Sequence, residues 1–186
     1  VKYVNMADII LDTGGKTAAA ADKLAATGSA PDEIVALIEL LFFAYRDFVS
    51  DPDHILGDYG FGRAHHRVIH FVGRNPGMHV AELLDILRIT KQSLSRVLRD
   101  LIDKGFVYQR EGSRDRRQRL LYLTPEGVEL HGRLITPQIN RIRSALGACD
   151  AETSDALRKA LFAMIEPDVR HHVLSLMGEA GPPPAS

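Results

Sequence analysis

The side chains with the clearest chemical capacity lie in the segment TKQSLSRVLR, residues 90–99. At about 100 degrees per residue, Gln92, Arg96 and Arg99 share the outward face of a helix, with Lys91 and Ser95 beside them. An arginine can donate two hydrogen bonds to guanine, and a glutamine amide can pair similarly with adenine. The spacing therefore predicts a helix face that is able to read a nucleic acid.

A second group of basic side chains follows in the segment QREGSRDRRQR, residues 109–119. Its arginines are Arg110, Arg114, Arg116, Arg117 and Arg119. From Arg88 to Arg119 the chain has ten basic and four acidic residues, a local charge of +6, whereas the whole chain carries −1. Such segregation is typical of a surface that binds a polyanion. The alternative is that these charges form an ordinary solvated face.

The first group of polar side chains is presented by an amphipathic helix that begins at Thr90. A threonine suits the N-cap because its hydroxyl accepts a hydrogen bond from a free backbone N–H of the first turn. Apolar residues at helical spacing predict a buried stripe of Leu94, Val97, Leu98, Leu101 and Ile102. A shorter amphipathic helix, residues 79–87, precedes it, and only two residues separate them. Two helices joined so tightly cross steeply, which predicts a helix-turn-helix.

The arginine-rich segment lies between two β-favouring runs, residues 106–108 and 120–123. Gly112, Ser113 and Asp115 between them are turn residues, so the two runs are predicted to pair as a hairpin. Gly105 suits the end of the preceding helix. The order of elements is therefore helix, turn, helix and a two-stranded ribbon with an arginine-rich tip.

The segment from Gly77 to Thr124 resembles the winged helix-turn-helix of the MarR family, the multiple antibiotic resistance regulators. The matching sequences are AELLDIL in the first helix, ITKQSLSRVLRDLIDKGFV in the recognition helix and SRDRRQRLLYLTPEG in the wing and the start of the next helix. The resemblance implies a mainly α fold with a small β-hairpin wing, flanked by N- and C-terminal dimerisation helices. Two departures are His79, where a Ser or Thr cap is usual, and Arg88, where the turn is often glycine.

The resemblance implies a sequence-specific transcriptional regulator, a ligand-responsive repressor, that binds double-stranded DNA as a homodimer and needs no cofactor. Together with the side-chain chemistry, it assigns DNA contacts to Thr90, Lys91, Gln92, Ser93, Ser95, Arg96, Arg99, Arg110, Arg114, Asp115, Arg116 and Arg117. Arg116 is expected at the minor groove, with Asp115 or Arg117 bracing the tip. Two-fold symmetry predicts a pseudo-palindromic operator with half-sites about 34 Å apart.

Around the winged unit, the chain is predicted to be helical. Pro31 and Asp32 suit the start of a helix that runs to about Ser50, and turn-rich residues 51–60 follow it. A last helical stretch, from Asp150, is interrupted near Pro167. The predicted organisation is an N-terminal arm (1–30), an N-terminal dimerisation helix and connection (31–60), the winged helix-turn-helix (61–124), C-terminal dimerisation helices (125–178) and a disordered tail (179–186).

The histidines offer a separate chemistry. His66 and His70 stand at i and i+4, the spacing that lets two imidazoles share one metal ion on a helix face. However, Arg67 stands where a HExxH motif has its glutamate, and no Cys or acid accompanies the pair at diagnostic spacing. The alternative is that they border an effector pocket, which the family often forms between the winged unit and the dimer helices. That pocket is assigned to Phe42, Tyr45, His66, Ile69 and His70, and the resemblance implies a small aromatic or phenolic effector.

Composition limits the other classes of protein. With 45% hydrophobic and 25% charged residues, the 186-residue chain has an ordinary globular composition. It has no apolar run of the roughly 18 residues that span a membrane, no secretory pattern and one cysteine, Cys149, so a cytoplasmic location without membrane contact is expected. It also lacks a GxSxG motif, a metal triad and a phosphate-binding loop, which disfavours an enzyme. A metal-responsive regulator and a non-specific architectural DNA-binding protein remain the alternatives.

Overall fold

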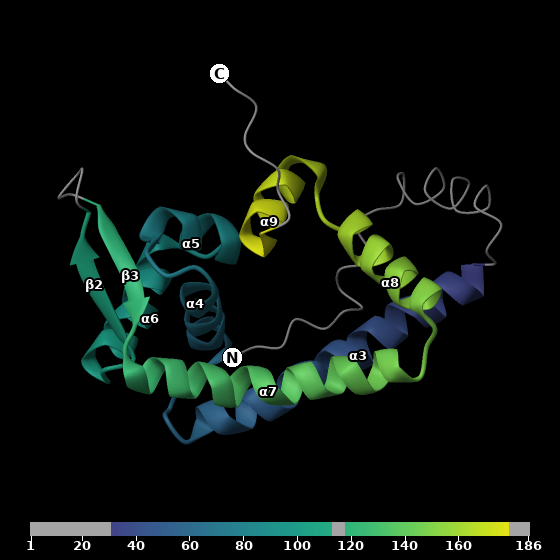
Figure 1. Cartoon of the computed structure of the whole chain (residues 1–186), viewed down its shortest axis with the longest axis horizontal. Helices are drawn as coiled ribbons and strands as arrows, with labels where there is room; N and C mark the ends of the chain where they lie inside the picture. Colours follow the sequence, from purple (N-terminus) through teal and green to yellow (C-terminus); the bar gives the residue numbers. More distant parts are fainter. Residues whose placement is uncertain (1–30, 113–117, 179–186) are drawn as a thin grey trace, which may run out of the picture. The chain divides into compact units, whose positions relative to one another are not determined.

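The computed structural model describes residues 31–112 and 118–178. The elements are α3 (Pro31–Gly57), α4 (Arg63–Arg74), β1 (Met78–His79), α5 (Val80–Leu87), α6 (Lys91–Asp103), β2 (Val107–Glu111), β3 (Arg119–Leu123), α7 (Pro125–Gly147), α8 (Ala151–Ala163), the 3-10 turn η1 (Pro167–Val169) and α9 (Arg170–Met177) (Figure 1). The mainly helical fold with a small β wing is confirmed. The expected arm (1–30), the wing tip (113–117) and the expected tail (179–186) lie outside the described residues.

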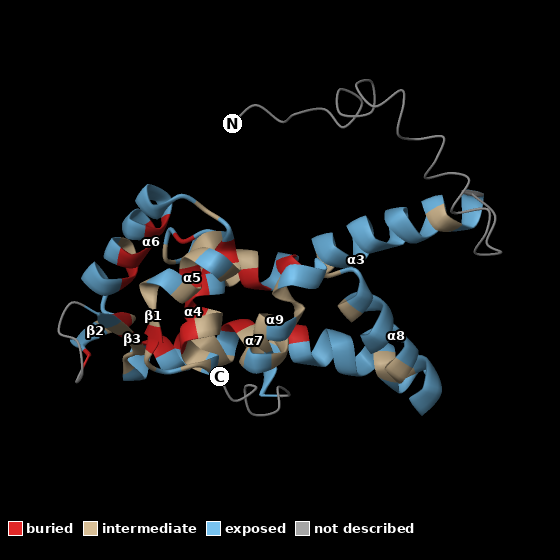
Figure 2. Ribbon diagram, turned by 90° about the horizontal axis from the view of Figure 1, so that it is seen from above, coloured by how far each residue is buried: buried red, intermediate tan, exposed pale blue. Residues whose placement is uncertain are grey.

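The chain divides into two compact units, residues 1–48 and 49–186. The described part of the first unit is the beginning of α3, whose first turn carries Asp32 and Glu33, as a helix N-terminus favours. Figure 2 shows most of this part of α3 in the colour of exposed residues. Its exposed side chains include large apolar ones, Val35, Leu37, Ile38, Leu40, Leu41, Phe42, Phe43 and Tyr45. In the single chain, this part of α3 therefore exposes a long apolar surface to solvent.

The helix α3 is longer than predicted. It was expected to end near Ser50, but it continues through Pro52 to Gly57. Tertiary contacts hold the extension, since Arg141 reaches Asp51 at 3.0 Å and Arg63 reaches Asp53 at 2.9 Å. Pro52 is also buried. Proline and turn residues favour an end locally, and packing overrides that preference.

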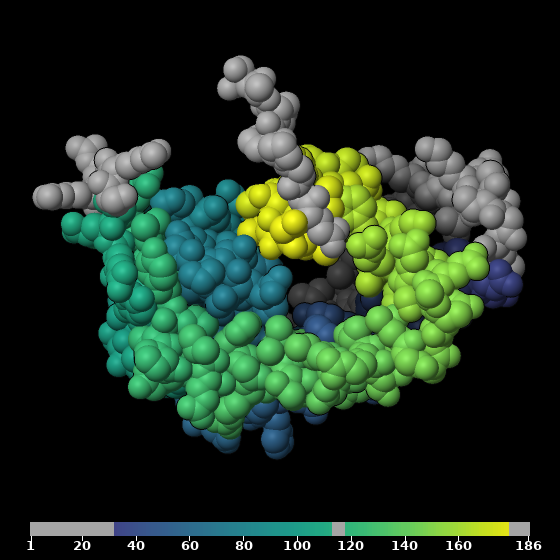
Figure 3. All heavy atoms as spheres, in the orientation of Figure 1, coloured from purple at the N-terminus to yellow at the C-terminus, as the bar shows by residue number. Residues whose placement is uncertain are grey.

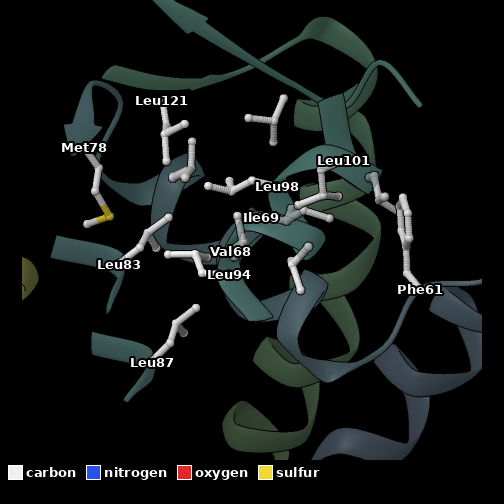
Figure 4. Packing of buried hydrophobic residues seen from close by; sticks show 14 of the residues in the cluster. Phe61, Val68, Ile69, Met78, Leu83, Leu87, Leu94, Leu98, Leu101 and Leu121 are labelled. Atoms are coloured by element: carbon white, nitrogen blue, oxygen red, sulfur yellow. The ribbon is translucent and has the colours of Figure 1, made fainter. Parts of the chain in front are cut away.

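The hydrophobic core of the second unit lies between α4, α5, α6 and the sheet (Figure 4). Val68 and Ile69 of α4 are fully buried there. Leu83 of α5, Leu101 of α6 and Leu121 of β3 are buried to the same degree. Each such side chain contributes about 1.5–3 kcal/mol to folding. The core thus fixes the angle at which α6 leaves α5.

The sheet has three antiparallel strands in the order β1-β3-β2, one more than the predicted hairpin. The predicted pairing of β2 with β3 is present, with Val107 opposite Leu123 and Glu111 opposite Arg119. The additional strand is only two residues long, and its Met78 pairs with Leu121. A strand this short has no periodicity to detect, so only its partner reveals it.

The second half of the chain is helical, as predicted. Thr124 caps α7 by accepting from the backbone N–H of Gly127 at 3.0 Å, and Pro125 occupies the first turn. The last stretch is interrupted near Pro167, as expected: α8 ends at Ala163, Pro167 begins η1, and α9 follows. None of the helices in the described ranges is long and apolar enough to span a bilayer.

Candidate nucleic-acid interface

The helix α6 has one buried and one exposed side. Leu94, Val97, Leu98 and Leu101 are buried, as the spacing predicts. The fifth apolar residue, Ile102, is 36% exposed, so the prediction that it is buried is wrong. It lies at the edge of the stripe, where the packing partners end. The polar residues Lys91, Gln92, Ser95, Arg96 and Arg99 are all exposed on the opposite side. The described structure therefore presents this face to solvent as one polar surface.

Thr90 and Ser93 act first as a cap for α6. The backbone N–H of Ser93 donates to the Thr90 hydroxyl oxygen at 3.1 Å. The Thr90 hydroxyl in turn donates to the Ser93 hydroxyl oxygen at 2.8 Å. Both residues are exposed. These two side chains stabilise the end of the helix that carries the polar face.

The turn between α5 and α6 depends on Arg88. Its backbone is left-handed, with φ 49 and ψ 45, and its N–H donates to the Leu84 carbonyl at 2.9 Å. Among the described residues it is the one non-glycine with positive φ. This conformation costs a non-glycine residue about 1 kcal/mol. Arg88 is exposed, and it precedes Lys91, the first residue of α6, by three positions.

The departure at His79 is resolved by a different cap. The backbone N–H of His79 donates to the Glu82 carboxylate at 2.5 Å. This contact is the reverse half of a capping box, in which an acid at the third helical position reaches back to the N-cap. The start of α5 therefore does not need a Ser or Thr.

In the wing, Arg110 packs on aromatic rings. The rings of Tyr108 and Tyr122 stack across β2 and β3 with their centroids 5.4 Å apart. The Arg110 guanidinium carbon lies 5.3 Å from the first ring and 5.5 Å from the second. At the far end of the ladder, Arg119 pairs with Glu111 at 2.8 Å. Arg110 thus braces the wing, a role that its sequence position alone did not indicate. The predicted tip contacts Arg114, Asp115, Arg116 and Arg117 lie outside the described residues.

The candidate metal residues lie in a partly buried histidine cluster. The ring centroids of His70 and His131 are 5.6 Å apart. Burial lowers the pKa of His70 to about 4, with further lowering by His131, His66 and Arg74. Burial is also the main cause that lowers the pKa of His66 and of His131. These imidazoles are therefore neutral at pH 7. Within residues 31–112 and 118–178, however, no three His, Cys, Asp or Glu side chains are grouped so that they could hold a metal ion.

The residues assigned to an effector pocket are divided between the two units of the chain. Ile69 is fully buried in the core, so its side chain is unavailable to an open pocket, and His66 is also buried. Phe42 and Tyr45 are exposed residues of the first unit. Only His70 of this set lines a described cavity of about 610 Å³. Helical spacing alone cannot distinguish a residue that is buried in the core from one that lines a pocket.

That cavity lies between the winged unit and the C-terminal helix. Its lining is His70, Phe71, Arg74, Asn75, Asp85, Ile86, Arg88, Asp168, Val169, His172, Val173, Leu176 and Met177. Figure 3 shows the atoms of α9, in yellow, beside those of α5, in blue. The Nε2 atom of His172 is buried and has no hydrogen-bond partner in the described structure. Six of the thirteen lining residues are apolar and seven are polar or charged, so the cavity offers both apolar surface and hydrogen-bonding groups.

A capped, exposed recognition helix beside a paired wing defines the class of winged helix-turn-helix proteins. The MarR family model matches residues 59–118. The HTH-type transcriptional regulator PetP of Rhodobacter capsulatus is 49% identical over 135 residues, which cover 73% of this chain and 81% of the relative. The chain therefore belongs to the MarR family of transcriptional regulators, as its resemblance predicted.

Solved structures share the fold at lower identity. A MarR transcriptional regulator from Methanosarcina mazei Go1 has a TM-score of 0.56 and 21% identity, over 69% of this chain and 92% of that one. A mutant MarR from E. coli complexed with operator DNA has a TM-score of 0.55 and 20% identity, over 74% of this chain and 100% of that one. The family's members are regulators rather than enzymes, which fits the absence of catalytic motifs from the sequence.

Proposed function

We propose that this protein is a sequence-specific regulator that binds duplex DNA through the exposed face of α6. The single observation that carries the proposal is the polarity of α6, whose apolar side is buried in the core while Lys91, Gln92 and Arg96 are exposed near its N-terminal end. Helix-turn-helix proteins contact base edges with the N-terminal residues of this helix.

Each side chain on this face has a role that suits its chemistry. Gln92 and Arg96 read base edges in the major groove, because both can form two parallel hydrogen bonds. Lys91 and Ser95 add contacts in the same groove. Arg99 and the cap at Thr90 lie nearer the phosphates. The wing residues Arg114–Arg117 complete the contact at the minor groove. Arg110 supports them indirectly, because it packs on the Tyr108 ring and stabilises the strands of the wing.

We also propose that the working form is a homodimer. The large apolar side chains that α3 exposes in the single chain support this arrangement, since a soluble monomer rarely exposes so long an apolar surface. Two-fold symmetry then requires two half-sites, about 34 Å apart, in a pseudo-palindromic operator.

The experiment that tests DNA recognition starts from a random pool of DNA duplexes. The wild-type protein is expected to enrich one pseudo-palindromic sequence, and to bind it at least a thousandfold more tightly than unrelated duplex at the same salt concentration. Fluorescence anisotropy measures both affinities. Enrichment of no sequence, with equal affinity for all duplexes, would support the non-specific architectural alternative instead.

The regulation we propose is relief of repression by a small aromatic carboxylate or phenol bound in the 610 Å³ cavity. Phe71, Ile86 and Leu176 offer apolar surface to a ring, and Arg74 and His172 offer donors to its polar group. The lining also includes Arg88, which forms the turn between α5 and α6, so a bound ligand would contact the helix-turn-helix itself. A ligand that binds one arrangement of this turn better shifts the population toward it.

A cavity-filling variant tests this regulation. A panel of aromatic carboxylates and phenols is expected to raise the melting temperature of the wild type by roughly 5 °C at hundredfold excess over Kd. Val173→Trp should abolish that shift, because the indole occupies the cavity, and should leave DNA binding intact. Ser175→Trp, on the exposed side of α9, is the matched control. An unchanged shift in Val173→Trp would place the ligand elsewhere.

A further inference from the structure

We propose that Lys104 and Tyr59 are positioning residues for DNA recognition, because they lock the C-terminal end of α6 to the loop that precedes α4. The inference rests on the proposed role of α6 in reading DNA. Lys104 is the C-cap of α6, directly after its last residue Asp103, and Tyr59 lies in the loop of residues 58–62, after the end of α3. Their contact joins parts of the chain that are 45 residues apart.

The lock is built on the Lys104 ammonium group. It donates a hydrogen bond to the backbone carbonyl of Tyr59. It also lies 4.7 Å from the centroid of the Phe61 ring, within the range of a cation–π interaction. Gly60, between Tyr59 and Phe61, has a φ of 65, and a Cβ there would lie 3.7 Å from the Lys104 ammonium nitrogen. The left-handed glycine therefore lets the loop turn so that carbonyl and ring converge on one cation.

Three aromatic rings hold the loop in place beneath the cation. The rings of Tyr59 and Phe61 stack at 5.9 Å. Both meet the ring of Phe106 edge-on, at 5.3 and 5.5 Å respectively. Phe106 stands three residues after the last residue of α6, and its N–H donates to the Leu101 carbonyl at 2.9 Å. Aromatic pairs in such geometry have specific orientations, so the loop has little freedom to slide.

Two further contacts tie the same loop to its neighbours. The His65 ring stacks on Phe61 at 4.6 Å, and its Nε2 lies 3.4 Å from the Asp100 carboxylate of α6. Arg133 of α7 donates to the Tyr59 hydroxyl oxygen at 2.5 Å. The last turn of α6 is consequently held at two points, Asp100 and Lys104, and the loop is anchored to α7 as well.

The consequence for DNA reading follows from the length of α6. The reading residues begin at Lys91, so they lie up to 13 residues from the lock, about 20 Å along a helix. A tilt of about 5 degrees at the locked end would displace the reading end by about 1.7 Å. Such a displacement breaks hydrogen bonds to base edges, which require donor–acceptor distances near 3 Å. The lock therefore controls specificity without contacting a base.

A cation at this position could instead contact a phosphate, and salt dependence separates the two roles. The probe is the duplex that the wild type enriches from a random pool, and the variant is Lys104→Met, which keeps the aliphatic stem. We expect its affinity for that duplex to fall about 5- to 10-fold, its affinity for unrelated duplex to stay within twofold, and the slope of log K against log salt to be unchanged. A lost phosphate contact would reduce that slope by about 0.9 and weaken all sequences equally.

Controls complete the test. Lys159→Met removes an exposed lysine of α8 that pairs with Asp155, and it is expected to leave both affinities and the slope unchanged. Tyr59→Phe keeps the ring and the carbonyl but removes the Arg133 partner, so it should show the same loss of specificity in milder form if Lys104→Met is too unstable to measure. Wild-type specificity or a reduced slope in Lys104→Met would overturn the inference. If that variant is too unstable to measure, wild-type specificity in Tyr59→Phe would overturn it. Failure of the wild type to enrich any duplex would instead remove the proposed function on which it rests.

Discussion

Arg96→Ala is expected to weaken binding to the selected operator about 5- to 150-fold, the equivalent of about 1–3 kcal/mol. Arg96 is exposed on the polar face of α6, three positions after Ser93 of the cap. Its guanidinium can form paired hydrogen bonds with a guanine. The neighbouring Leu94 and Val97 are buried, so the helix cannot rotate to substitute another side chain. The affinity is measured by fluorescence anisotropy at one fixed salt concentration.

The matched control for this variant is Arg143→Ala. Arg143 is an exposed arginine of α7, so its removal changes the net charge equally. It is expected to leave operator affinity within about twofold, because long-range charge effects are screened beyond about 10 Å at 0.1 M salt. The free energy of unfolding of both variants should lie within about 0.5 kcal/mol of the wild-type value, as is usual for substitutions at exposed positions. Equal affinities for Arg96→Ala and the wild type would rule out a base contact at this position.

Gly127→Ala is expected to lower the free energy of unfolding by about 3 kcal/mol or more. A Cβ at Gly127 would lie 2.0 Å from the backbone carbonyl oxygen of Phe106, far inside any permitted contact. That carbonyl also accepts from the Thr124 N–H at 3.1 Å, so it belongs to the join between α6, the sheet and α7. The clash is with backbone rather than with a flexible side chain, and relief requires α7 to move away from the winged unit.

Gly132→Ala, in the same helix, is expected to raise the free energy of unfolding instead. Nothing lies within 4 Å of a Cβ there, so the variant should gain up to about 1 kcal/mol from the better helix propensity of alanine. Urea unfolding followed by circular dichroism measures both variants at one protein concentration, since dimerisation would couple stability to concentration. Equal stability of the Gly127→Ala variant and the wild type would contradict the close approach of α7 to Phe106.

The parts of the fold that depend on local chemistry could be predicted from the sequence. Thr90 and Thr124 are caps because a hydroxyl satisfies backbone N–H groups in any context, and both are observed as caps. The period of the apolar residues likewise predicted the buried stripe of α6 through Leu101, because that period alone decides which side of a helix is apolar. The helix-turn-helix, its wing and its family therefore followed from short segments.

Other features depend on residues far apart in the chain. The strand Met78–His79 exists only because β3 offers it partners, and α3 passes Pro52 because Arg63 and Arg141 hold its last turns. The cavity beside Arg88 is lined in part by α9, some 80 residues further along the chain. The spacing of His66 and His70 could not predict this cavity, because it carries no information on which distant helix packs nearby.

The polar face of α6, which we propose reads DNA, could be predicted from the sequence, since the polarity of a helix depends on that helix and its cap alone. How this face is held in place depends on contacts between distant parts of the chain. Lys104 is an ordinary surface lysine in the sequence, and it becomes the end of a lock because folding brings Tyr59 and Phe61 to it from 45 and 43 residues away. Local chemistry sets the type of each element, whereas its angle and anchoring come from contacts that the chain makes only when it is folded.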